Sequence, residues 1–279
     1  MARKFVEIAP FVPIEYRYEN ERTLYRGESD YQKIMVFENP YFGKMLILDG
    51  IVQLTERDEF FYHEMLTHVV MYAHPNPRKV IVIGGGDGGT VREVLKHRTV
   101  EKVYFIEIDK KVIEISKKYF PTVSCGIDDP RVEIKNMDGA EFVKKCSKDI
   151  DIVIVDSTDP IGFARSLFTN KFFTSICNTL TASGMFVTHS ESLLLHKEMV
   201  IEVQETLKGV FPKVDVYTAP IATYPGNWWA FCVASKRFNP RQVKRKSRIK
   251  TKYYSEEIHK YAFLPRGLYR KLMQRKLEW

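Results

Sequence analysis

A short apolar run that leads into a cluster of glycines constrains this chain more than any other stretch. Residues 80–89 are Val-Ile-Val-Ile-Gly-Gly-Gly-Asp-Gly-Gly. The branched apolar residues predict a buried strand, and the apolar spacing of residues 91–97 predicts a helix. Gly84, Gly86 and Gly89 fit the pattern G-x-G-x-x-G, which is typical of a backbone that turns sharply and lets a ligand approach. The stretch therefore predicts a strand, a tight turn and a helix at the edge of an α/β sheet.

Two acidic residues narrow the kind of ligand. Asp87 lies inside the glycine turn, and Glu107 closes the next predicted strand, which begins near Lys102. A phosphate group favours a helix N-terminus, so a carboxylate there would repel it and would instead attract an amine or a sulfonium. A carboxylate at the end of the second strand suits two ribose hydroxyls. Together they favour a positively charged nucleoside without phosphate over a glycine turn with a solvated Asp87.

Composition limits the class of protein. The chain has 279 residues, a net charge of +8 and no uninterrupted apolar run of membrane-spanning length, so we expect a main domain with a smaller companion and no membrane partner. The N-terminus lacks the apolar core of a signal peptide. Cysteines occur without metal-ligand spacing, at Cys125, Cys146, Cys177 and Cys232. We therefore expect a cytoplasmic protein with reduced thiols and no metal.

The positive charge is concentrated in residues 236–252. This segment contains nine basic residues and no acidic residue, a composition that is compatible with a nucleic-acid tail. Phe238 is its single aromatic residue, whereas aromatic residues are what stack on bases. We therefore favour a solvated connector over a nucleic-acid partner, followed by helical spacing from Tyr253 onward.

Residues 1–56 predict a small antiparallel β domain. Several stretches alternate between apolar and polar residues, and Asp49-Gly50 is a strong signal for a hairpin turn. Thr55 and Asp58 resemble a capping box, which predicts that a helix over about 57–73 begins directly after this domain. Residues 57–279 are expected to form the second, catalytic domain.

Strands and helices alternate after residue 79, which predicts a parallel sheet covered on both faces. Four acids, each after a predicted strand, fall at the carboxyl edge of that sheet, where such folds bind ligands: Asp87, Glu107, Asp138 and Asp156. Aspartate is also a favoured helix N-cap, so one or two of the four could be caps. Four acids on one rim of a basic protein nevertheless predict a pocket for a cation.

Sequence blocks along nearly the whole chain resemble the polyamine aminopropyltransferase family, typified by spermidine synthase. The blocks occupy residues 25–32, 36–40, 48–58, 62–64, 84–89, 107–109, 156–160 and 223–226. The resemblance implies a Rossmann-like, methyltransferase-type sheet, an N-terminal β domain, and a homodimer or homotetramer. It also implies that decarboxylated S-adenosylmethionine, as a co-substrate rather than a cofactor, donates an aminopropyl group to a diamine and leaves as methylthioadenosine.

The chemistry of this transfer needs a carboxylate that binds the attacking ammonium and removes its proton. Asp156, at a strand end, is the candidate base, and Asp87 is expected to hold the donor's amine and to lie beside the acceptor. By resemblance, the donor's ribose and adenine contact Gln32, Glu107, Asp138 and Gly139. The acceptor side is lined, also by resemblance, by Tyr62, His63, Ser157, Thr158, Asp159 and Tyr224. Without the resemblance, Tyr62 and His63 would be read as core residues of an apolar helix.

The chain departs from the family pattern near the acceptor. Phe163 and Arg165 stand where the family usually has proline and then an acid, and His189 stands where glutamine is common. Leu193-Leu194 replaces a bulkier or proline-containing pair and predicts a more aliphatic wall. The resemblance makes putrescine our first expectation, because it is the family's commonest acceptor, and the aliphatic wall adds cadaverine, agmatine or a longer polyamine as alternatives. An S-adenosylmethionine methyltransferase, an NAD oxidoreductase and a non-catalytic polyamine-binding protein are less favoured.

Overall fold

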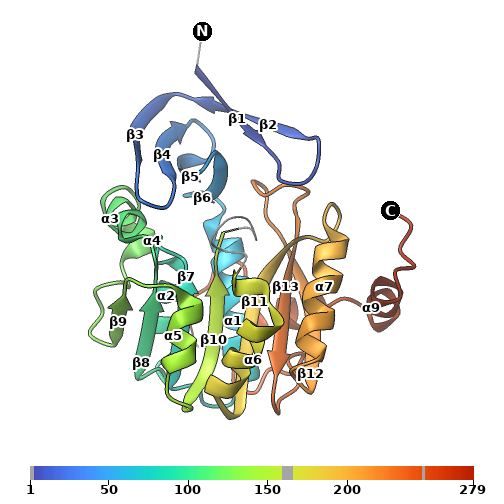
Figure 1. The fold of residues 1–279 in the computed structure, drawn as a ribbon. Coiled ribbons are helices and arrows are strands. Elements are labelled where there is room, and N and C mark those ends of the chain that lie inside the picture. Colours follow the sequence, from blue (N-terminus) through green and yellow to red (C-terminus); the bar gives the residue numbers. More distant parts are fainter. Residues whose placement is uncertain (1–2, 159–165, 247–248) are drawn as a thin grey trace.

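The computed structural model describes residues 3–158, 166–246 and 249–279. A seven-stranded sheet with the order β12-β13-β11-β10-β7-β8-β9 forms its centre. Figure 1 shows helices on both faces of this sheet and the N-terminal strands above its carboxyl edge. The predicted α/β fold with a Rossmann-like sheet and N-terminal antiparallel strands is confirmed.

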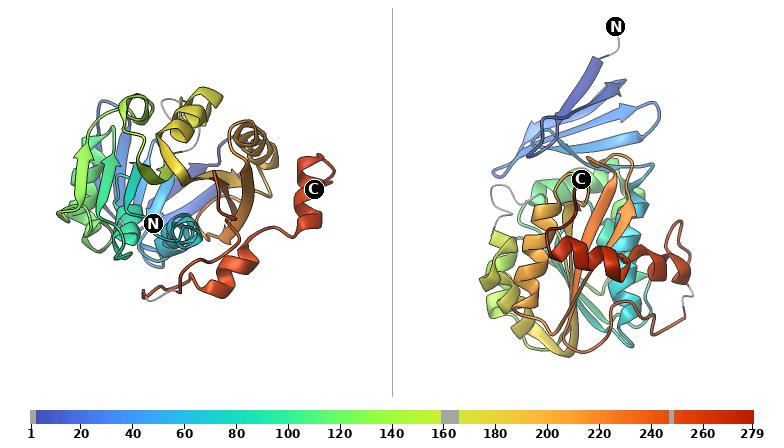
Figure 2. Two further views of the ribbon diagram at one scale, coloured as in Figure 1. Left: turned by 90° about the horizontal axis from the view of Figure 1, so that it is seen from below. Right: turned by 90° about the vertical axis from the view of Figure 1, so that its right-hand side faces the viewer.

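The N-terminal strands form two antiparallel sheets that stand at one end of the molecule (Figure 2, right). The predicted turn at Asp49-Gly50 is present, and both residues have positive φ angles of 49° and 87°, as a two-residue hairpin turn requires. Apolar side chains of the four-stranded sheet pack on the helices after β8. The strands are β1 (Arg3–Ile8), β2 (Glu15–Asn20), β3 (Arg22–Glu28), β4 (Lys33–Asn39), β5 (Gly43–Leu48) and β6 (Ile51–Thr55).

Five neighbouring strands of the central sheet, from β11 to β9 in the order given above, are parallel. Strand β13 pairs antiparallel with both of its neighbours, β11 and β12. Strand β11 continues beyond His189 to Ser192, with a register shift against β13 between these two residues. Glu191 lies in this irregular part with a positive φ of 67°. The strands are β7 (Lys79–Gly84), β8 (Lys102–Ile106), β9 (Val132–Lys135), β10 (Ile150–Asp156), β11 (Leu180–Ser192), β12 (Lys213–Pro220) and β13 (Trp228–Ser235).

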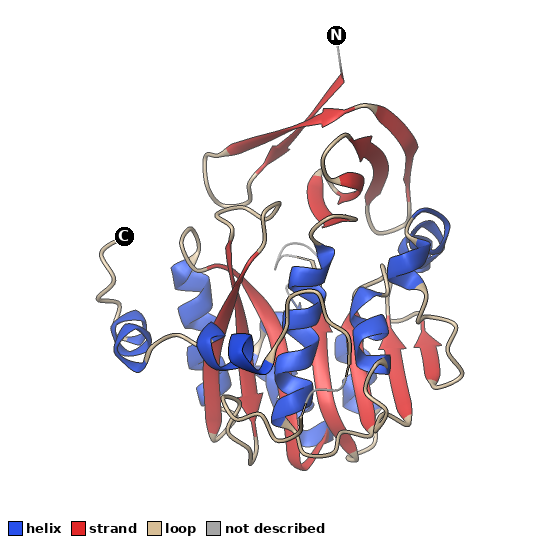
Figure 3. Ribbon diagram, turned by 180° about the vertical axis from the view of Figure 1, so that it is seen from behind, coloured by secondary structure: helices blue, strands red, loops and turns tan. Residues whose placement is uncertain are grey.

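Helices cover both faces of this sheet, as the view from behind shows (Figure 3). Val80 and Val82 of β7 pack in the core that contains α1 and α2, whereas Ile81 and Ile83 pack in the core of α6 and α7. This explains the uninterrupted apolar run of the strand, because both of its faces are buried. The helices are α1 (Glu59–Ala73), α2 (Gly89–Leu95), α3 (Lys110–Tyr119), α4 (Pro121–Ser124), α5 (Gly139–Lys145), α6 (Asn170–Thr179), α7 (Lys197–Lys208), α8 (Glu256–Ala262) and α9 (Arg266–Met273).

Helix α1 begins later than the capping pattern predicts. Its N-cap is Asp58, whose side chain makes no capping hydrogen bond. Thr55 Oγ1 instead donates to Asp58 Oδ1 at 2.5 Å, and Thr223 donates to Asp58 Oδ2 from its amide and its hydroxyl. Asp58 therefore ties the start of α1 to the loop before β13, which fixes both at the carboxyl edge.

The basic segment is docked rather than fully solvated, so the prediction of a solvated connector is wrong for its described middle. Arg245 Nη2 donates to the Met71 carbonyl, and the Lys244 amide donates to the Tyr72 carbonyl. These contacts satisfy carbonyls near the end of α1, which otherwise have no helical partner. Helices α8 and α9 follow, as the spacing after Tyr253 predicts. Within the described ranges, no helix combines the length and apolar character needed to cross a membrane.

Candidate active site

A cavity of about 680 Å³ lies between the N-terminal strands and the carboxyl edge of the central sheet. Residues of β5 and β6 line one side of it, and the loops after β7, β8 and β10 line the other. Predicted Asp159 lies outside the described residues. The other predicted site residues all line this cavity: Gln32, Tyr62, His63, Asp87, Glu107, Asp138, Gly139, Asp156, Ser157, Thr158 and Tyr224.

The glycine turn after β7 is built for close contact within the protein. A Cβ atom on Gly84 would come within 2.2 Å of the Asp156 carbonyl oxygen, and one on Gly85 within 2.5 Å of Asp156 Oδ2. A Cβ on Gly89 would come within 2.3 Å of His63 Cε1. Gly84, Gly85 and Gly86 also line the cavity, so the turn lies where the sequence pattern predicts that a ligand can approach. The turn therefore brings Asp156 and His63 against the loop that carries Asp87.

Asp156 is buried at the end of β10, and both of its carboxylate oxygens are held. Tyr62 Oη donates to Oδ1 at 2.8 Å, and Thr90 Oγ1 donates to Oδ2 at 2.6 Å. Burial, and then the charge of nearby Asp87, raise the pKa of Asp156 above its ordinary value. A fixed carboxylate with a raised pKa is suited to accept a proton near neutral pH.

The pKa of Asp87 is shifted in the opposite direction from that of Asp156, below its ordinary value. Asp87 Oδ1 accepts from the Gly89 amide at 2.7 Å and lies 3.2 Å from His63 Nε2. Burial opposes its ionisation, but the neighbouring His63 outweighs burial and lowers the pKa of Asp87. Two adjacent carboxyl groups with pKa values shifted apart can take different roles, one as a fixed anion and one as a proton acceptor.

Together these groups form a site for a cation. One ligand atom from each of His63, Asp87 and Asp156 lies within 4.8 Å of the others. Three such atoms can hold a metal ion when the ring is neutral, and the two carboxylates can equally accept the N–H groups of an ammonium. The adjacent cavity is large enough for an organic ligand, so the geometry suits a molecule that carries a positive charge at one end.

Glu107 lies further along the rim of the same cavity. Its Oε1 accepts from the Asp109 amide at 2.8 Å. Burial raises the pKa of Glu107 to about 7, and the amide contact opposes this shift. Gln32 reaches the same loop from the N-terminal strands, because its Nε2 donates to Asp109 Oδ2 at 2.8 Å. Among the described residues no cation pairs with Glu107, so its carboxylate can accept from hydroxyl groups of a ligand.

Asp138 is also the N-cap of α5, because its side chain accepts from the Glu141 amide at 2.9 Å. The alternative interpretation as a helix cap is thus correct for Asp138. The next residue, Gly139, packs so closely on β7 that a Cβ would come within 2.3 Å of Ile83 Cγ2. Asp156 differs, since its described partners are the hydroxyl groups of Tyr62 and Thr90.

A second, smaller cavity of about 30 Å³ adjoins Tyr62, Ser157 and Tyr224. His189 lines it and stacks on Trp229 with a ring distance of 6.0 Å. His189 Nε2 lies 2.8 Å from the Ser157 carbonyl, and a carbonyl only accepts, so Nε2 carries a hydrogen. The predicted aliphatic wall is wrong: Leu193 is buried in the core, Leu194 is exposed, and neither is among the described residues lining the two cavities.

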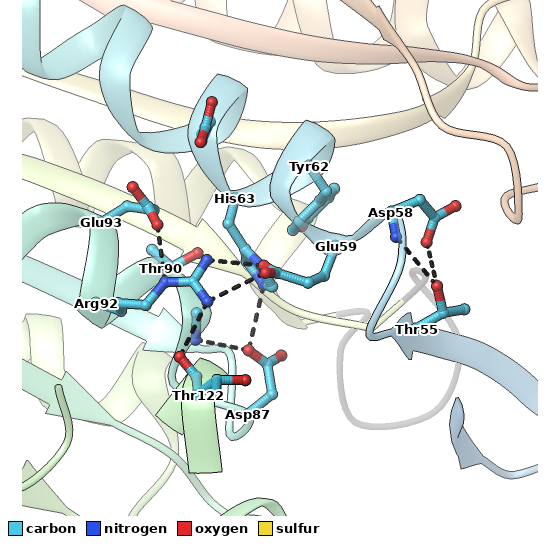
Figure 4. Close-up of polar contacts among 12 residues, drawn as sticks. Thr55, Asp58, Glu59, Tyr62, His63, Asp87, Thr90, Arg92, Glu93 and Thr122 are labelled. Atoms are coloured by element: carbon cyan, nitrogen blue, oxygen red, sulfur yellow. Dashed lines mark hydrogen bonds and ion pairs between the residues drawn. The ribbon is translucent and has the colours of Figure 1, made fainter. Parts of the chain in front are cut away.

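Several residues that shape the site were missed by the sequence interpretation. Thr90, directly after the glycine run, holds Asp156. Glu59 lies four residues before His63, and its Oε2 is 2.6 Å from His63 Nδ1. Arg92 reaches Glu59 from α2 (Figure 4). The i, i+4 spacing of a carboxylate and a histidine is a signal that could have pointed to Glu59.

Known proteins match this chain over almost its whole length. A family model described as the spermine/spermidine synthase domain matches residues 59–247, and one described as the spermidine synthase tetramerisation domain matches residues 5–56. A polyamine aminopropyltransferase of Hydrogenobaculum is 52% identical over 96% of each chain. Polyamine aminopropyltransferase 1 of Aquifex aeolicus is 51% identical over the same share.

Solved structures agree in fold. A crystal structure of spermidine synthase in complex with the transition state analogue AdoDATO is 39% identical and superposes with a TM-score of 0.92, covering 99% of this chain and 97% of that chain. The spermidine synthase of Thermotoga maritima gives a TM-score of 0.91 at 39% identity, covering 99% of this chain and 96% of that chain. The chain therefore belongs to the spermine/spermidine synthase family of aminopropyltransferase enzymes.

Proposed function

We propose that this enzyme transfers the aminopropyl group of decarboxylated S-adenosylmethionine to a diamine, with putrescine as the first choice, and forms spermidine and methylthioadenosine. The observation that carries the proposal is the Asp87–Asp156 pair beside His63 at the edge of a cavity of about 680 Å³. Both substrates are cations, and paired carboxylates near one another can bind an ammonium on each side of the reacting carbon.

The donor occupies the larger part of the cavity in this proposal. Asp87 holds its primary ammonium, Glu107 and Gln32 lie at the ribose, and Asp138 with Gly139 lies at the adenine. A related spermidine synthase binds the transition state analogue AdoDATO, and this supports the proposal that the donor binds in this cavity.

The acceptor amine must be neutral when it attacks. At a pKa near 10.4, roughly one amine in 2,500 is neutral at pH 7. Asp156 takes the proton, a nitrogen–carbon bond forms, and the carbon–sulfur bond breaks with its electron pair passing to sulfur. The sulfonium releases a neutral thioether, which is a good leaving group, so we propose no resident cofactor and no metal in this step.

The acceptor lies on the side of Tyr62, His63, Ser157, Thr158, Asp159 and Tyr224 in this proposal. Tyr62 and Tyr224 support it by their position, since their rings are 5.6 Å apart on the cavity wall. The smaller cavity with His189 adjoins this side at Tyr62, Ser157 and Tyr224, which supports some use of a longer amine such as cadaverine, agmatine or a polyamine.

We also propose a homo-oligomer, a dimer or a tetramer, assembled through residues 1–56, with residues 57–279 forming the catalytic domain. The match to a tetramerisation domain over residues 5–56 supports this division. Exposed apolar side chains near the N-terminus also support it: Val6, Ile8 and Phe11 are 43%, 65% and 62% exposed. The four cysteines are free, in keeping with the proposed reducing cytoplasm.

A screen of acceptors tests this proposal. The enzyme is incubated with decarboxylated S-adenosylmethionine and, separately, with putrescine, cadaverine, agmatine or spermidine, and release of methylthioadenosine is measured. We expect release with putrescine and a lower but measurable kcat/KM for one longer amine. Methyl transfer from S-adenosylmethionine would identify a methyltransferase instead, and amine binding without release would identify a polyamine-binding protein.

The variant His189→Gln sharpens the acceptor part of the screen. We expect it to change the ratio of kcat/KM between the longer amine and putrescine, because one added methylene changes discrimination by only about 1–3 kcal/mol. An unchanged ratio, with the same kinetics for each amine, would place His189 outside the acceptor site.

A further inference from the structure

A buried ion pair lies directly behind the cation site. Arg92 Nη1 and Nη2 donate to the two oxygens of Glu59 at 3.1 Å and 2.8 Å. The Glu59 side chain is 5% exposed and that of Arg92 15% exposed. Arg92 is anchored in turn by its Nε, which donates to Glu93 Oε1 at 2.8 Å. This two-pronged geometry fixes the Glu59 carboxylate in one orientation.

The fixed Glu59 carboxylate contacts the His63 ring and so holds the ring in place (Figure 4). Glu59 Oε2 is 2.6 Å from His63 Nδ1, and His63 Nε2 is 3.2 Å from Asp87 Oδ1. The ring also rests on Gly89, where a Cβ would come within 2.3 Å of Cε1. His63 is therefore held at both nitrogens and on one edge.

The two contacts of the ring define its charge. An ionised carboxylate only accepts hydrogen bonds, so a ring between two carboxylates needs a hydrogen on each nitrogen. Burial by itself lowers the pKa of His63, but Asp87 and Glu59 outweigh burial and raise this pKa well above its ordinary value. Glu59 stays ionised because His63 and Arg92 outweigh burial and lower the pKa of Glu59 to about 2.

The Asp87 carboxylate depends on this arrangement although its backbone lies in a tight turn. Gly84, Gly85 and Gly88 around it have positive φ angles of 78°, 71° and 82°, a region of backbone conformation that glycine enters freely, and the Gly88 amide donates to the Gly85 carbonyl at 2.8 Å. The contacts that orient the Asp87 carboxylate are the Gly89 amide and His63. Loss of the ring's position would remove one of these two contacts and loosen the carboxylate.

We propose that Glu59 and Arg92 are positioning residues that hold His63 against Asp87 and so fix the carboxylate that receives a substrate ammonium. The identity of that substrate rests on the function proposed above, whereas the positioning itself rests on the contacts from Arg92 through Glu59 and His63 to Asp87. Around the ring, the facing charged or titratable groups are Glu59, Asp87, Asp156 and Tyr62.

A double-mutant cycle tests whether Glu59 acts through His63. Binding of decarboxylated S-adenosylmethionine and of methylthioadenosine, which lacks the ammonium, is measured by calorimetry for wild type, Glu59→Gln, His63→Gln and the double variant. We expect Glu59→Gln to weaken donor binding about tenfold, to spare methylthioadenosine, and to add nothing in the His63→Gln background. Independent, multiplying effects of the two substitutions would overturn the proposal.

Glu64→Gln is the matched control. Glu64 is a buried carboxylate on the same helix, but it accepts from the amides of Lys252, Tyr253 and Tyr254. We expect this variant to lower the melting temperature and to leave the ratio of donor affinity to methylthioadenosine affinity unchanged. If Glu64→Gln changed that ratio as much as Glu59→Gln, the effect would reflect general destabilisation and the proposal would fail.

Histidine NMR tests the positioning without any substrate. The ring signals of His63 are assigned by their absence in His63→Gln and followed against pH in the ligand-free protein. We expect the His63 titration in Glu59→Gln to move toward acid by about one pH unit or more. An unmoved titration would refute the positioning role even if the enzyme is active. A moved titration in a protein that does not bind the donor would refute the proposed function and retain the positioning of His63.

Discussion

Helix α1 carries two buried histidines that meet different surroundings. His63 lies between two carboxylates at the cavity. His68 lies five residues further along, with Nδ1 3.0 Å from His97 Nε2 and Nε2 2.9 Å from Glu93 Oε2. Burial, followed by the charges of His68 and Arg245, lowers the pKa of His97 well below its ordinary value, whereas the pKa of His63 is raised. Burial lowers the pKa of both the His63 and the His97 ring; two carboxylates reverse this shift at His63, whereas the charges near His97 add to it.

Two buried carboxylates of α1 also have different partners. Glu59 faces the cation site through His63, whereas Glu64 accepts from three consecutive backbone amides, those of residues 252–254. One side of the helix thus carries groups that can exchange a proton or bind a cation. Another side carries contacts that hold the chain together. Substitutions on the two sides should separate catalysis from stability.

The largest expected effect is on the cavity side. Asp156→Asn keeps the shape of the side chain but cannot take the proton from the acceptor amine. We expect kcat to fall by about 10²–10⁴-fold, with a melting temperature close to that of wild type. Calorimetry should show that methylthioadenosine still binds. A variant with kcat near the wild-type value at neutral pH would show that Asp156 is not the base.

Away from the cavity, Glu64→Gln should lower the stability of the protein rather than its activity. Glutamine has a single acceptor oxygen, so at least one of the amides at residues 252–254 loses its charged partner. We expect the free energy of unfolding to fall by about 1–3 kcal/mol, with kcat nearly unchanged. Denaturant unfolding and steady-state kinetics on the same preparation check this. A large loss of kcat at unchanged stability would remove the distinction between the two sides.

Glu107, on the cavity side, affects stability in a way that depends on pH. Its pKa is raised from about 4.5 to about 7 in the folded protein. The folded protein therefore holds this proton more tightly than the unfolded chain, so the contribution of Glu107 to stability is greatest below pH 4.5 and is lost as pH rises through 7. We expect ligand-free Glu107→Gln to gain up to about 3 kcal/mol relative to wild type between pH 5 and pH 8. Unfolding curves with the same difference at both pH values would contradict this.

Much of the fold follows from the sequence because its signals are local. The apolar run before Gly84 predicts β7, and Asp49-Gly50 predicts the hairpin between β5 and β6, as observed. The end of β11 could not be predicted in this way, since it depends on a register shift against β13 near His189. A tertiary pairing of that kind leaves no periodic pattern in one strand.

The candidate site could also be predicted only in part. Acids at strand ends could be predicted to meet at one edge, because parallel strands place their carboxyl ends together. The close contact between Gly89 and the His63 ring could not be predicted, because it depends on how α1 packs on α2. The docking of Arg245 on α1 was missed because a basic run looks the same whether it is solvated or anchored by a few carbonyls.

The central claim is that the Asp87–Asp156 pair binds an ammonium and that Asp156 removes its proton. The most direct test is the single-turnover rate of methylthioadenosine formation between pH 6 and pH 9, at saturating donor and putrescine. The account predicts a rate that rises with pH, because Asp156, whose pKa is raised, must be ionised before it can take the proton, and because a larger share of the amine is neutral at higher pH. A rate that stays flat over this range would contradict the claim that deprotonation of the amine at Asp156 is part of the barrier.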